Sequence, residues 1–302
     1  MKSLTRREFL KASAIGAGAL VATSAGGRSE TVPVTPRTAA DRVKLGKTGL
    51  VASRLAQGTG VHGGNQQSDH SRMGQEAFTK LIRYDFDKGL NFWDMADLYG
   101  THTMMRKAME GIDRDKYVVL SKVWTRPEKW NDQAGGATAA VSRFCKELNT
   151  DALDICLIHC MIDKDWTERE KRVRDELSEL KQKGKVRALG VSCHSHDALK
   201  TAAAHPWVDV ILARINHMGG EKYKMDGTVA EITETLKLAR ANGKTVIGMK
   251  IFGEGTLVKP EEKDASLKYV LNSDIVDAIT IGMSKIEEVD DCFNRIANAL
   301  RV

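Results

Sequence analysis

The chain has 302 residues, of which 42% are hydrophobic and 28% are charged. This length and balance exclude a minimal domain and indicate a globular protein with an ample core, either one large barrel or two ordinary domains. The net charge of +6 falls to about +3 without residues 1–25, and there is no arginine-rich run, so no nucleic acid partner is expected. The five cysteines form no C-x-x-C pair, which argues against a disulfide framework.

The first 25 residues have the three parts of an export signal. A basic segment ending at Lys11 precedes a weakly apolar run over 14–22 and then small residues that end at Ala25. The pair Arg6-Arg7, followed by Phe-Leu-Lys, resembles the twin-arginine signal. We therefore expect 1–25 to be a twin-arginine signal peptide that meets the export machinery transiently, and the protein to be periplasmic. A chance basic helix is the alternative.

Residues 26–41 contain two glycines and two prolines and predict a flexible tether. Beyond it, two short apolar segments flank Gly46-Lys47-Thr48-Gly49, which predicts a small hairpin. From there apolar strand-like runs alternate with helix-period segments. The strands are expected at 55–58, 90–94, 117–121, 153–158, 186–191, 208–213, 244–249 and 275–281, and the helices near 75–88, 102–110, 137–148, 168–183, 195–204, 228–242, 264–272 and 285–300.

Eight strands alternating with eight helices predict an α/β fold of the (β/α)8 TIM barrel type over residues 42–302. A doubly wound sheet is the alternative, but it would need fewer strands or a second domain. In a barrel the functional site lies at the carboxyl ends of the strands. Those ends carry polar residues at almost every position.

Four of these polar residues can form a proton donor. Asp94 ends the second expected strand, Tyr99 follows it, and Lys122 and His159 follow the next two strands. An ammonium near a phenol favours the phenolate and so lowers the phenol's pKa. Asp94 would pair with Lys122, and His159 could position a carbonyl oxygen or relay a proton. Each residue alone also has an ordinary structural interpretation.

The motifs around these residues resemble the aldo-keto reductase family over roughly 43–302. Asp94-Met95-Ala96-Asp97-Leu98-Tyr99-Gly100 is similar to its Asp-x-Ala-x-x-Tyr-Gly signature, and the residues around Lys122 and His159 match two more. The resemblance implies that the hairpin closes the bottom of the barrel. It also implies that Tyr99 is the general acid, Lys122 its pKa modulator, Asp94 the partner of Lys122, and His159 the residue that orients the carbonyl.

The resemblance further implies a nicotinamide cofactor bound across the barrel mouth. The positions that match its binding segments are Gly58, Thr59, Ser192, Asn216, Lys250, Gly253, Gly255, Ser284 and Lys285. Cys193, Ile215 and Cys292 depart from the family pattern, and Glu287 and Glu288 crowd the expected anchor of the adenosine phosphate. NADP is therefore only mildly preferred, and NAD is possible.

The expected reaction is reduction of an aldehyde or ketone, or oxidation of the alcohol, with Tyr99 as general acid. Trp124, Trp130 and Trp166 could form walls of an apolar substrate pocket. His159, Cys160, Cys193 and His194 could supply nitrogen and sulfur ligands to zinc, but no compact ligand motif supports such a site, so no metal is expected. We also expect no iron–sulfur segment. A cofactor-binding sensor or interaction module on the same barrel, with little turnover, is the alternative function.

Overall fold

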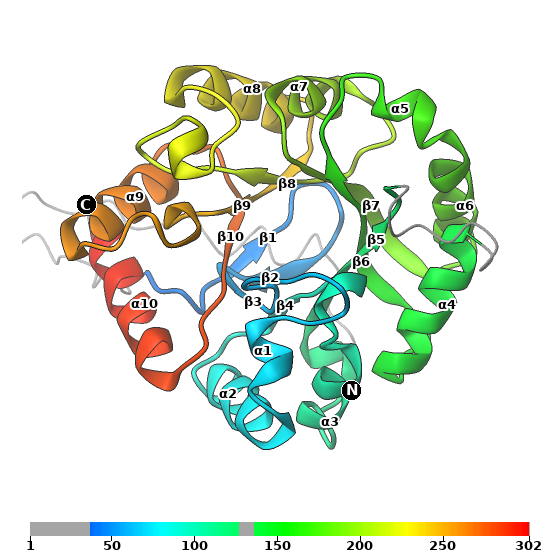
Figure 1. The fold of residues 1–302 in the computed structure, drawn as a ribbon, viewed down its shortest axis with the longest axis horizontal. Helices are drawn as coiled ribbons and strands as arrows, with labels where there is room; N and C mark the ends of the chain where they lie inside the picture. The colour runs from blue at the N-terminus through cyan, green and yellow to red at the C-terminus, as the bar shows by residue number, and fades with distance from the viewer. Residues whose placement is uncertain (1–36, 127–135, 302) are drawn as a thin grey trace, which may run out of the picture. The chain divides into compact units, whose positions relative to one another are not determined.

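The computed structural model describes residues 37–126 and 136–301, which form a closed parallel barrel (Figure 1). The expected signal peptide, most of the tether and Trp130 lie outside these residues. The eight barrel strands run in the order β10-β3-β4-β5-β6-β7-β8-β9. They are β3 (Leu55–Gly58), β4 (Phe92–Asp94), β5 (Val118–Trp124), β6 (Leu153–Met161), β7 (Val186–Cys193), β8 (Val210–Arg214), β9 (Thr245–Met249) and β10 (Ala278–Ile281). The (β/α)8 prediction is confirmed.

Helices surround the strands in Figure 1. Those close to the expected ranges are α2 (Gln75–Asp87), α3 (His102–Ala108), α4 (Gly136–Leu148), α6 (Lys171–Gln182), α7 (His196–Ala204), α8 (Val229–Ala241), α9 (Pro260–Asn272) and α10 (Ile286–Ala299). The short helix α1 (Asp69–Arg72) was not predicted, and α5 (Trp166–Arg169) is separate from α6 although the sequence predicts one helix over 168–183. One turn of helix cannot carry a clear 3.6-residue period, so the sequence gives little sign of either. Among the described residues, none of the helices has the length and apolar character needed to span a bilayer.

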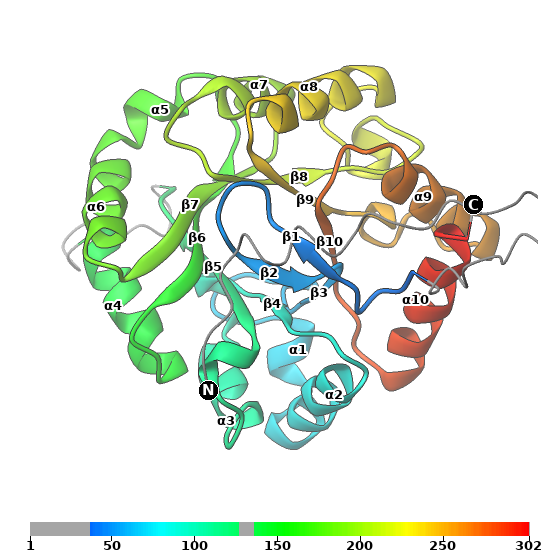
Figure 2. The ribbon, with the colours of Figure 1, turned by 180° about the vertical axis from the view of Figure 1, so that it is seen from behind.

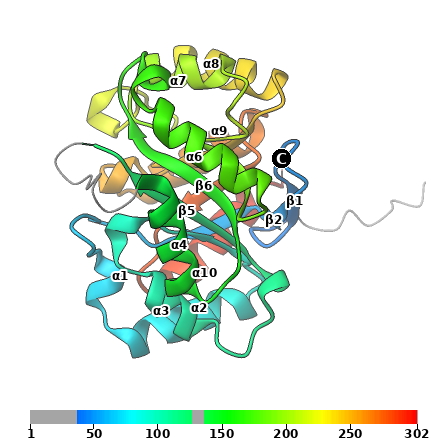
Figure 3. The ribbon, with the colours of Figure 1, turned by 90° about the vertical axis from the view of Figure 1, so that its right-hand side faces the viewer.

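The hairpin closes one end of the barrel. Strands β1 (Arg42–Lys44) and β2 (Val51–Ser53) pair antiparallel, with Arg42 opposite Ser53. Leu45 and Leu50, from the loop between them, are buried together with apolar side chains of the barrel interior. Figure 2 shows this hairpin across the barrel opening, and Figure 3 shows it at the end opposite α1. The other end of the barrel is therefore the mouth.

Strand alternation divides the core into two layers. Residues such as Phe92, Leu120 and Leu157 belong to the inner cluster with the hairpin, whereas Trp93, Val119 and Ile158 pack in the outer cluster against the helices. This is the two-residue period of a strand that is buried on both faces. The inner positions nearest the carboxyl ends therefore point into the mouth.

Strands β5, β6 and β7 extend further than expected. The sequence predicts their ends at 121, 158 and 191, but they end at Trp124, Met161 and Cys193. The apolar runs stop early because the next inward positions are the polar residues Lys122, His159 and Ser192. The backbone pairing continues past them, with Lys122 opposite Leu157 and Trp124 opposite His159. A change to polar side chains at a barrel mouth thus marks the site and not the strand end.

Candidate functional site at the barrel mouth

Lys122 and Asp94 form a buried ion pair at the mouth. The Lys122 ammonium, only 1% exposed, donates to Asp94 Oδ1 and to the Met95 carbonyl oxygen at 2.8 Å. Thr280, the inward residue of β10, donates its hydroxyl to Asp94 Oδ2 at 2.9 Å. A buried charge is tolerated when it is paired and its remaining donors find acceptors. Both oxygens of Asp94 are therefore occupied, and the ammonium has a fixed position.

Tyr99 lies beside this pair. A short 3-10 helix (Asp97–Tyr99) ends at Gly100, whose φ of 67° allows the chain to turn directly after the tyrosine. Lys122 Nζ lies 4.8 Å from the centroid of the Tyr99 ring, and the Tyr99 hydroxyl lies 3.5 Å from His159 Nε2. The described structure thus brings together all four residues proposed as the proton donor.

The loop after β3 packs closely on the Tyr99 ring. A Cβ atom on Gly60 would lie 2.3 Å from Tyr99 Cζ, and one on Gly63 would lie 2.7 Å from Cδ1. Any side chain at Gly60 would therefore overlap the phenol. The sequence pattern did not single out this role, because glycines in a loop have many possible reasons.

The pKa of Tyr99 shifts upward, whereas the sequence-based expectation is that Lys122 lowers it. Burial raises the pKa of Tyr99, Lys122 lowers it, and Asp94 raises it again, so that the net direction is upward. The lysine thus acts in the expected direction but does not outweigh burial. Burial would lower the pKa of Lys122, yet Asp94 and Tyr99 offset this and raise it overall. Lys122 is therefore a firmly charged ammonium.

His159 is a neutral imidazole. Burial lowers its pKa well below the ordinary value, and Lys122, His194 and Lys250 lower it further. The Trp124 ring meets it edge to face, with centroids 5.2 Å apart. Its Nδ1 atom has no hydrogen-bond partner within the described ranges. A neutral imidazole with Nε2 near the Tyr99 hydroxyl can donate one hydrogen bond to an oxygen held between them.

Trp166, which the sequence suggests as a wall of the substrate pocket, does not lie at the mouth. Trp166 is fully buried in the outer core, where its ring packs against Trp207 and His205. Its indole nitrogen donates to the Ala198 carbonyl oxygen at 3.3 Å. Trp166 therefore joins α5 to α7 and does not line the mouth. Trp124 alone, among the described tryptophans proposed for this role, contacts the site.

Three expected cofactor residues at or just beyond the ends of β3, β7 and β8 already have partners within the chain. The Thr59 hydroxyl donates to the Asp94 carbonyl oxygen at 3.1 Å, and Ser192 Oγ accepts the Cys160 N–H at 2.7 Å. Asn216 is fully buried, and its amide bonds the Tyr223 carbonyl and the N–H groups of the following turn. The Ser192 hydroxyl can still donate, whereas the amide of Asn216 mainly fixes the loop after β8.

The expected phosphate-binding residues carry internal counter-charges. Lys250 pairs with Glu254 at 2.5 Å, inside the turn that contains Gly253 and Gly255. Gly255 has a φ of 86° and open space where a side chain would lie, so the backbone there is accessible. At the start of α10, the Ser284 N–H donates to Glu288 at 2.7 Å, while Lys285 is exposed.

The departures from the family pattern lie away from the mouth. Cys193, Ile215 and Cys292 belong to the outer core cluster between strands and helices. The mouth residue of β8 is Arg214, which shares the inward register of Val210 and Leu212. It bonds Asp226 at 3.1 Å and contacts His194 Nδ1. Counting two residues forward along each strand, from Leu212 on β8 and from Ala278 on β10, would have identified Arg214 and Thr280 as mouth residues.

A surface recess of about 430 Å³ at the amino-terminal ends of β5 to β7 is lined by Arg114, Asp154 and Arg187, among others. Both arginines bond the buried Asp154, which also accepts the Val119 N–H, so this cluster joins neighbouring strands. In the part of the chain that the structure describes, no three His, Cys, Asp or Glu side chains are grouped as metal ligands would be.

Sequence comparisons agree with this arrangement. The model of the aldo/keto reductase family matches residues 55–267. Probable aldo-keto reductase 1 of Glycine max is 29% identical over 170 residues, which cover 54% of this chain but only 48% of the soybean protein. The 6-dehydroglucose reductase of Novosphingobium aromaticivorans is 26% identical over 239 residues, covering 72% of this chain and 71% of that enzyme.

Solved structures agree in fold. The holo form of the aldo-keto reductase AKR11C1 from Bacillus halodurans superposes with a TM-score of 0.66 at 18% identity, covering 86% of this chain and 91% of that one. The aldo-keto reductase PA4992 from Pseudomonas aeruginosa, described as putative, superposes with a TM-score of 0.70 at 22% identity, covering 86% of this chain and 96% of that one. At these identities the likeness shows the fold alone. Because the family match covers more than half of the chain and the barrel agrees, the protein belongs to the aldo/keto reductase family, a family of oxidoreductases.

Proposed function

We propose that this protein reduces an aldehyde or ketone, or oxidises the corresponding alcohol, with a nicotinamide cofactor and with Tyr99 as general acid. The observation that carries the proposal is the approach of the Tyr99 hydroxyl to His159 Nε2, next to the buried Lys122–Asp94 pair. A phenol and a neutral imidazole at this separation can both donate to one carbonyl oxygen. Family membership makes an oxidoreductase the coarser conclusion.

The proposed roles follow from the charges and contacts. His159, in the tautomer that carries hydrogen on Nε2, orients the carbonyl oxygen, and Tyr99 gives that oxygen its proton. The nearby Lys122 ammonium stabilises the phenolate that remains. Asp94 keeps Lys122 charged and in place. The nicotinamide, when bound, supplies the hydride to the carbonyl carbon.

The cofactor proposal is NADP(H), with NAD(H) as the alternative. Gly58, Thr59 and the donor hydroxyl of Ser192 would lie along the nicotinamide half, and the turn with Lys250, Gly253 and Gly255 along the diphosphate. Lys285, exposed at the start of α10, is the cation available to a 2′-phosphate, with the backbone of Ser284 beside it. Phosphates are favoured at such glycine turns and helix starts. Asn216 contributes by fixing the β8 loop.

The test is the substitution Tyr99→Phe. Loss of a general acid costs about 10²- to 10⁴-fold in rate, so reduction of a simple aldehyde should fall by that factor. Nucleotide binding, measured by the change in protein fluorescence, should persist. Tyr117→Phe, at the opposite end of the barrel, is the matched control and should keep full activity. Turnover that is unchanged in Tyr99→Phe would contradict the mechanism.

We also propose that residues 1–25 direct the chain to the twin-arginine route and that the protein works in the periplasm. The support is the paired Arg6-Arg7 before the weakly apolar run. Changing both arginines to lysine should leave the protein in the cytoplasmic fraction. The nucleotide that copurifies from the exported fraction would identify the cofactor. Export that continues in the double lysine variant would contradict the proposal.

A further inference from the structure

Arg214 lies across the mouth from the proton donor. β8 and β4 are four strands apart in the closed ring of eight, so the end of β8 is opposite Asp94. Arg214 continues the inward register of β8, and its side chain is 22% exposed. A guanidinium at this position faces the mouth, which the proposed substrate and cofactor share. It has no part in the proposed proton transfer.

Two neighbours fix the plane of this guanidinium. Asp226, from the loop between β8 and α8, accepts from Nη1 at 3.1 Å, and the second terminal nitrogen contacts His194 Nδ1. Asp226 is itself almost buried, and burial raises its pKa to about 6, although Arg214 acts to lower it. Nε of Arg214 is buried and has no hydrogen-bond partner in the described parts of the chain. The guanidinium is thus held in one orientation, with the Asp226 carboxylate as its hydrogen-bonded counter-charge.

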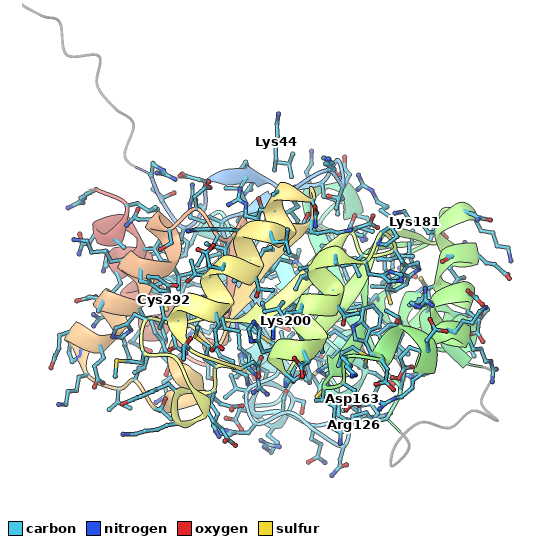
Figure 4. The ribbon with its side chains drawn as sticks, turned by 90° about the horizontal axis from the view of Figure 1, so that it is seen from above. Lys44, Arg126, Asp163, Lys181, Lys200 and Cys292 are labelled. Carbon is cyan, nitrogen blue, oxygen red and sulfur yellow. The ribbon has the colours of Figure 1, made fainter. Side chains whose placement is uncertain are left out.

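A second guanidinium, that of Arg126, lies just after the end of β5. Arg126 stacks over the Trp124 ring at 5.7 Å from its centroid, and its Nη1 lies 3.9 Å from Cys160 Sγ. Cys160 follows His159 directly and has a φ of 68°, at the irregularity where β6 shifts register. Figure 4 places Arg126 at the end of the molecule opposite Lys44 of the hairpin, which is the mouth end.

The thiol of Cys160 lies within the influence of both arginines. Burial raises its pKa, Arg126 and Arg214 lower it, and Asp226 raises it again. The neutral His194 is affected in the same way: after burial, the groups that lower its pKa include Arg214, Lys250 and Arg126. The side-chain cations that lower the pKa of one or both mouth histidines are Lys122, Lys250, Arg126 and Arg214. These four cations act on the region beside His159 and Cys160, and Asp226 is the carboxylate that opposes them at Cys160.

We propose that Arg214 and Arg126 bind a carboxylate of the substrate, so that the preferred substrates are oxo acids. With the carbonyl oxygen between Tyr99 and His159, the carboxylate would lie near Cys160, where guanidinium groups offer charge-assisted hydrogen bonds. This inference rests on the proposed function. The same chemistry could instead serve a phosphate of the nucleotide, and the experiment must separate the two.

The experiment compares 4-oxobutanoate with butanal, which have the same chain length and differ by the carboxylate. We expect wild-type kcat/KM to be at least about 10-fold higher for the acid, a difference of the size that charged hydrogen bonds provide. Arg214→Gln should reduce that ratio by about 10- to 100-fold, mainly through KM. Arg187→Gln, at the opposite end of the barrel, should leave the ratio unchanged.

Asp226→Asn should have the opposite effect on binding of the carboxylate. It keeps the shape of the side chain but removes the counter-charge of Arg214, so KM for 4-oxobutanoate should fall severalfold. A wild-type ratio near one would overturn the inference. So would a weaker affinity of Arg214→Gln for NADPH together with an unchanged ratio, since Arg214 would then serve the nucleotide phosphate.

A binding measurement separates this inference from the proposed function. Calorimetric titration of the wild-type protein with 4-hydroxybutanoate, with and without NADPH, needs no turnover, because the alcohol and the reduced cofactor do not react with each other. Binding that Arg214→Gln abolishes and Asp226→Asn strengthens would support the carboxylate site even if neither aldehyde were reduced. Absence of binding in both titrations would overturn it, and reduction of butanal alone would then leave the proposed function intact.

Discussion

Thr280 and Asp94 are joined by a 2.9 Å hydrogen bond that crosses β3, the strand between them. The bond passes beside Gly58, where a Cβ atom would lie 3.0 Å from the Thr280 hydroxyl oxygen. The glycine at the end of β3 thus leaves room for the contact. Because Lys122 occupies the other oxygen of Asp94, Thr280 takes part in setting the position of the ammonium beside Tyr99.

Removal of the Thr280 hydroxyl should impair catalysis without removing any proposed catalytic group. In Thr280→Val, Asp94 Oδ2 loses its buried donor, a change that costs about 1–3 kcal/mol. We expect kcat to fall by roughly 10-fold, with a shift in its pH profile. Thr280→Ser keeps the hydroxyl and should restore both. A normal pH profile in the valine variant would show that Asp94 and Lys122 need no such support.

The pH profile of alcohol oxidation should report on Lys122. In this direction Tyr99 must be deprotonated, so the rate rises as pH passes the pKa of the phenol. Lys122 acts to lower that pKa, and Asp94 acts to raise it. The double variant Asp94→Asn/Lys122→Met leaves no unpaired buried charge, and its profile should move to higher pH because Lys122 has the larger effect of the two on the phenol. We expect this shift from steady-state rates between pH 6 and 11; a shift to lower pH would contradict the role of Lys122.

The sequence predicts the barrel well because its signal is strong and repeated. Eight apolar runs with helices between them, and the hairpin at its start, all lie close to the observed ranges. The sequence also indicates the candidate residues of the proton donor, since Asp94 ends an apolar run and Lys122 and His159 each follow one. The structure adds the reason these residues meet: they occupy successive inward positions on adjacent strands.

The rest of the mouth depends on information that the sequence does not carry by itself. On β8 the sequence drew attention to Ile215 and Asn216, but the register directs Ile215 to the helices and gives the mouth position to Arg214. The partners of Asn216 and Arg214 come from loops whose course no periodicity predicts. Trp166 was misplaced for the same reason, because the one-turn helix α5 carries it into the outer core.

Glu288 should control the choice between NADP(H) and NAD(H). Its carboxylate accepts the Ser284 N–H at the start of α10, where an anion is also favoured by the helix dipole. Glu288→Gln keeps an acceptor for this N–H but removes the negative charge. The affinity for NADPH should then rise about fivefold, the equivalent of ~1 kcal/mol for an exposed charge. Fluorescence titration of each protein with NADPH measures this affinity.

NADH is the control for this prediction, since it has no 2′-phosphate and should bind Glu288→Gln and wild type equally. An equal gain for both nucleotides would show that Glu288 acts on the diphosphate or on the helix as a whole. An unchanged affinity for both would place the 2′-phosphate site elsewhere.

Asp85 should destabilise the protein at neutral pH. This side chain of α2 is fully buried, and neither of its carboxyl oxygens has a hydrogen-bond partner in the described structure. Burial raises its pKa well above the ordinary value, because the charged form is desolvated. The folded state therefore binds the proton more tightly than the unfolded state does. Its unfavourable contribution is absent below the unfolded pKa of about 3.9 and grows as pH rises toward the folded value.

Leucine has the same branching as aspartate, so Asp85→Leu fits the space while removing the charge. We expect this variant to unfold with a free energy about 1–3 kcal/mol greater than wild type at pH 7, with the advantage shrinking toward pH 4. Asp87→Leu, an exposed position on the same helix, should change stability by less than about 0.5 kcal/mol. Denaturant unfolding at pH 4, 5.5 and 7 tests both variants. Since the sign of the pH dependence is set by burial alone, a gain that grows toward pH 4 would mean that Asp85 is ionised and paired in the native protein.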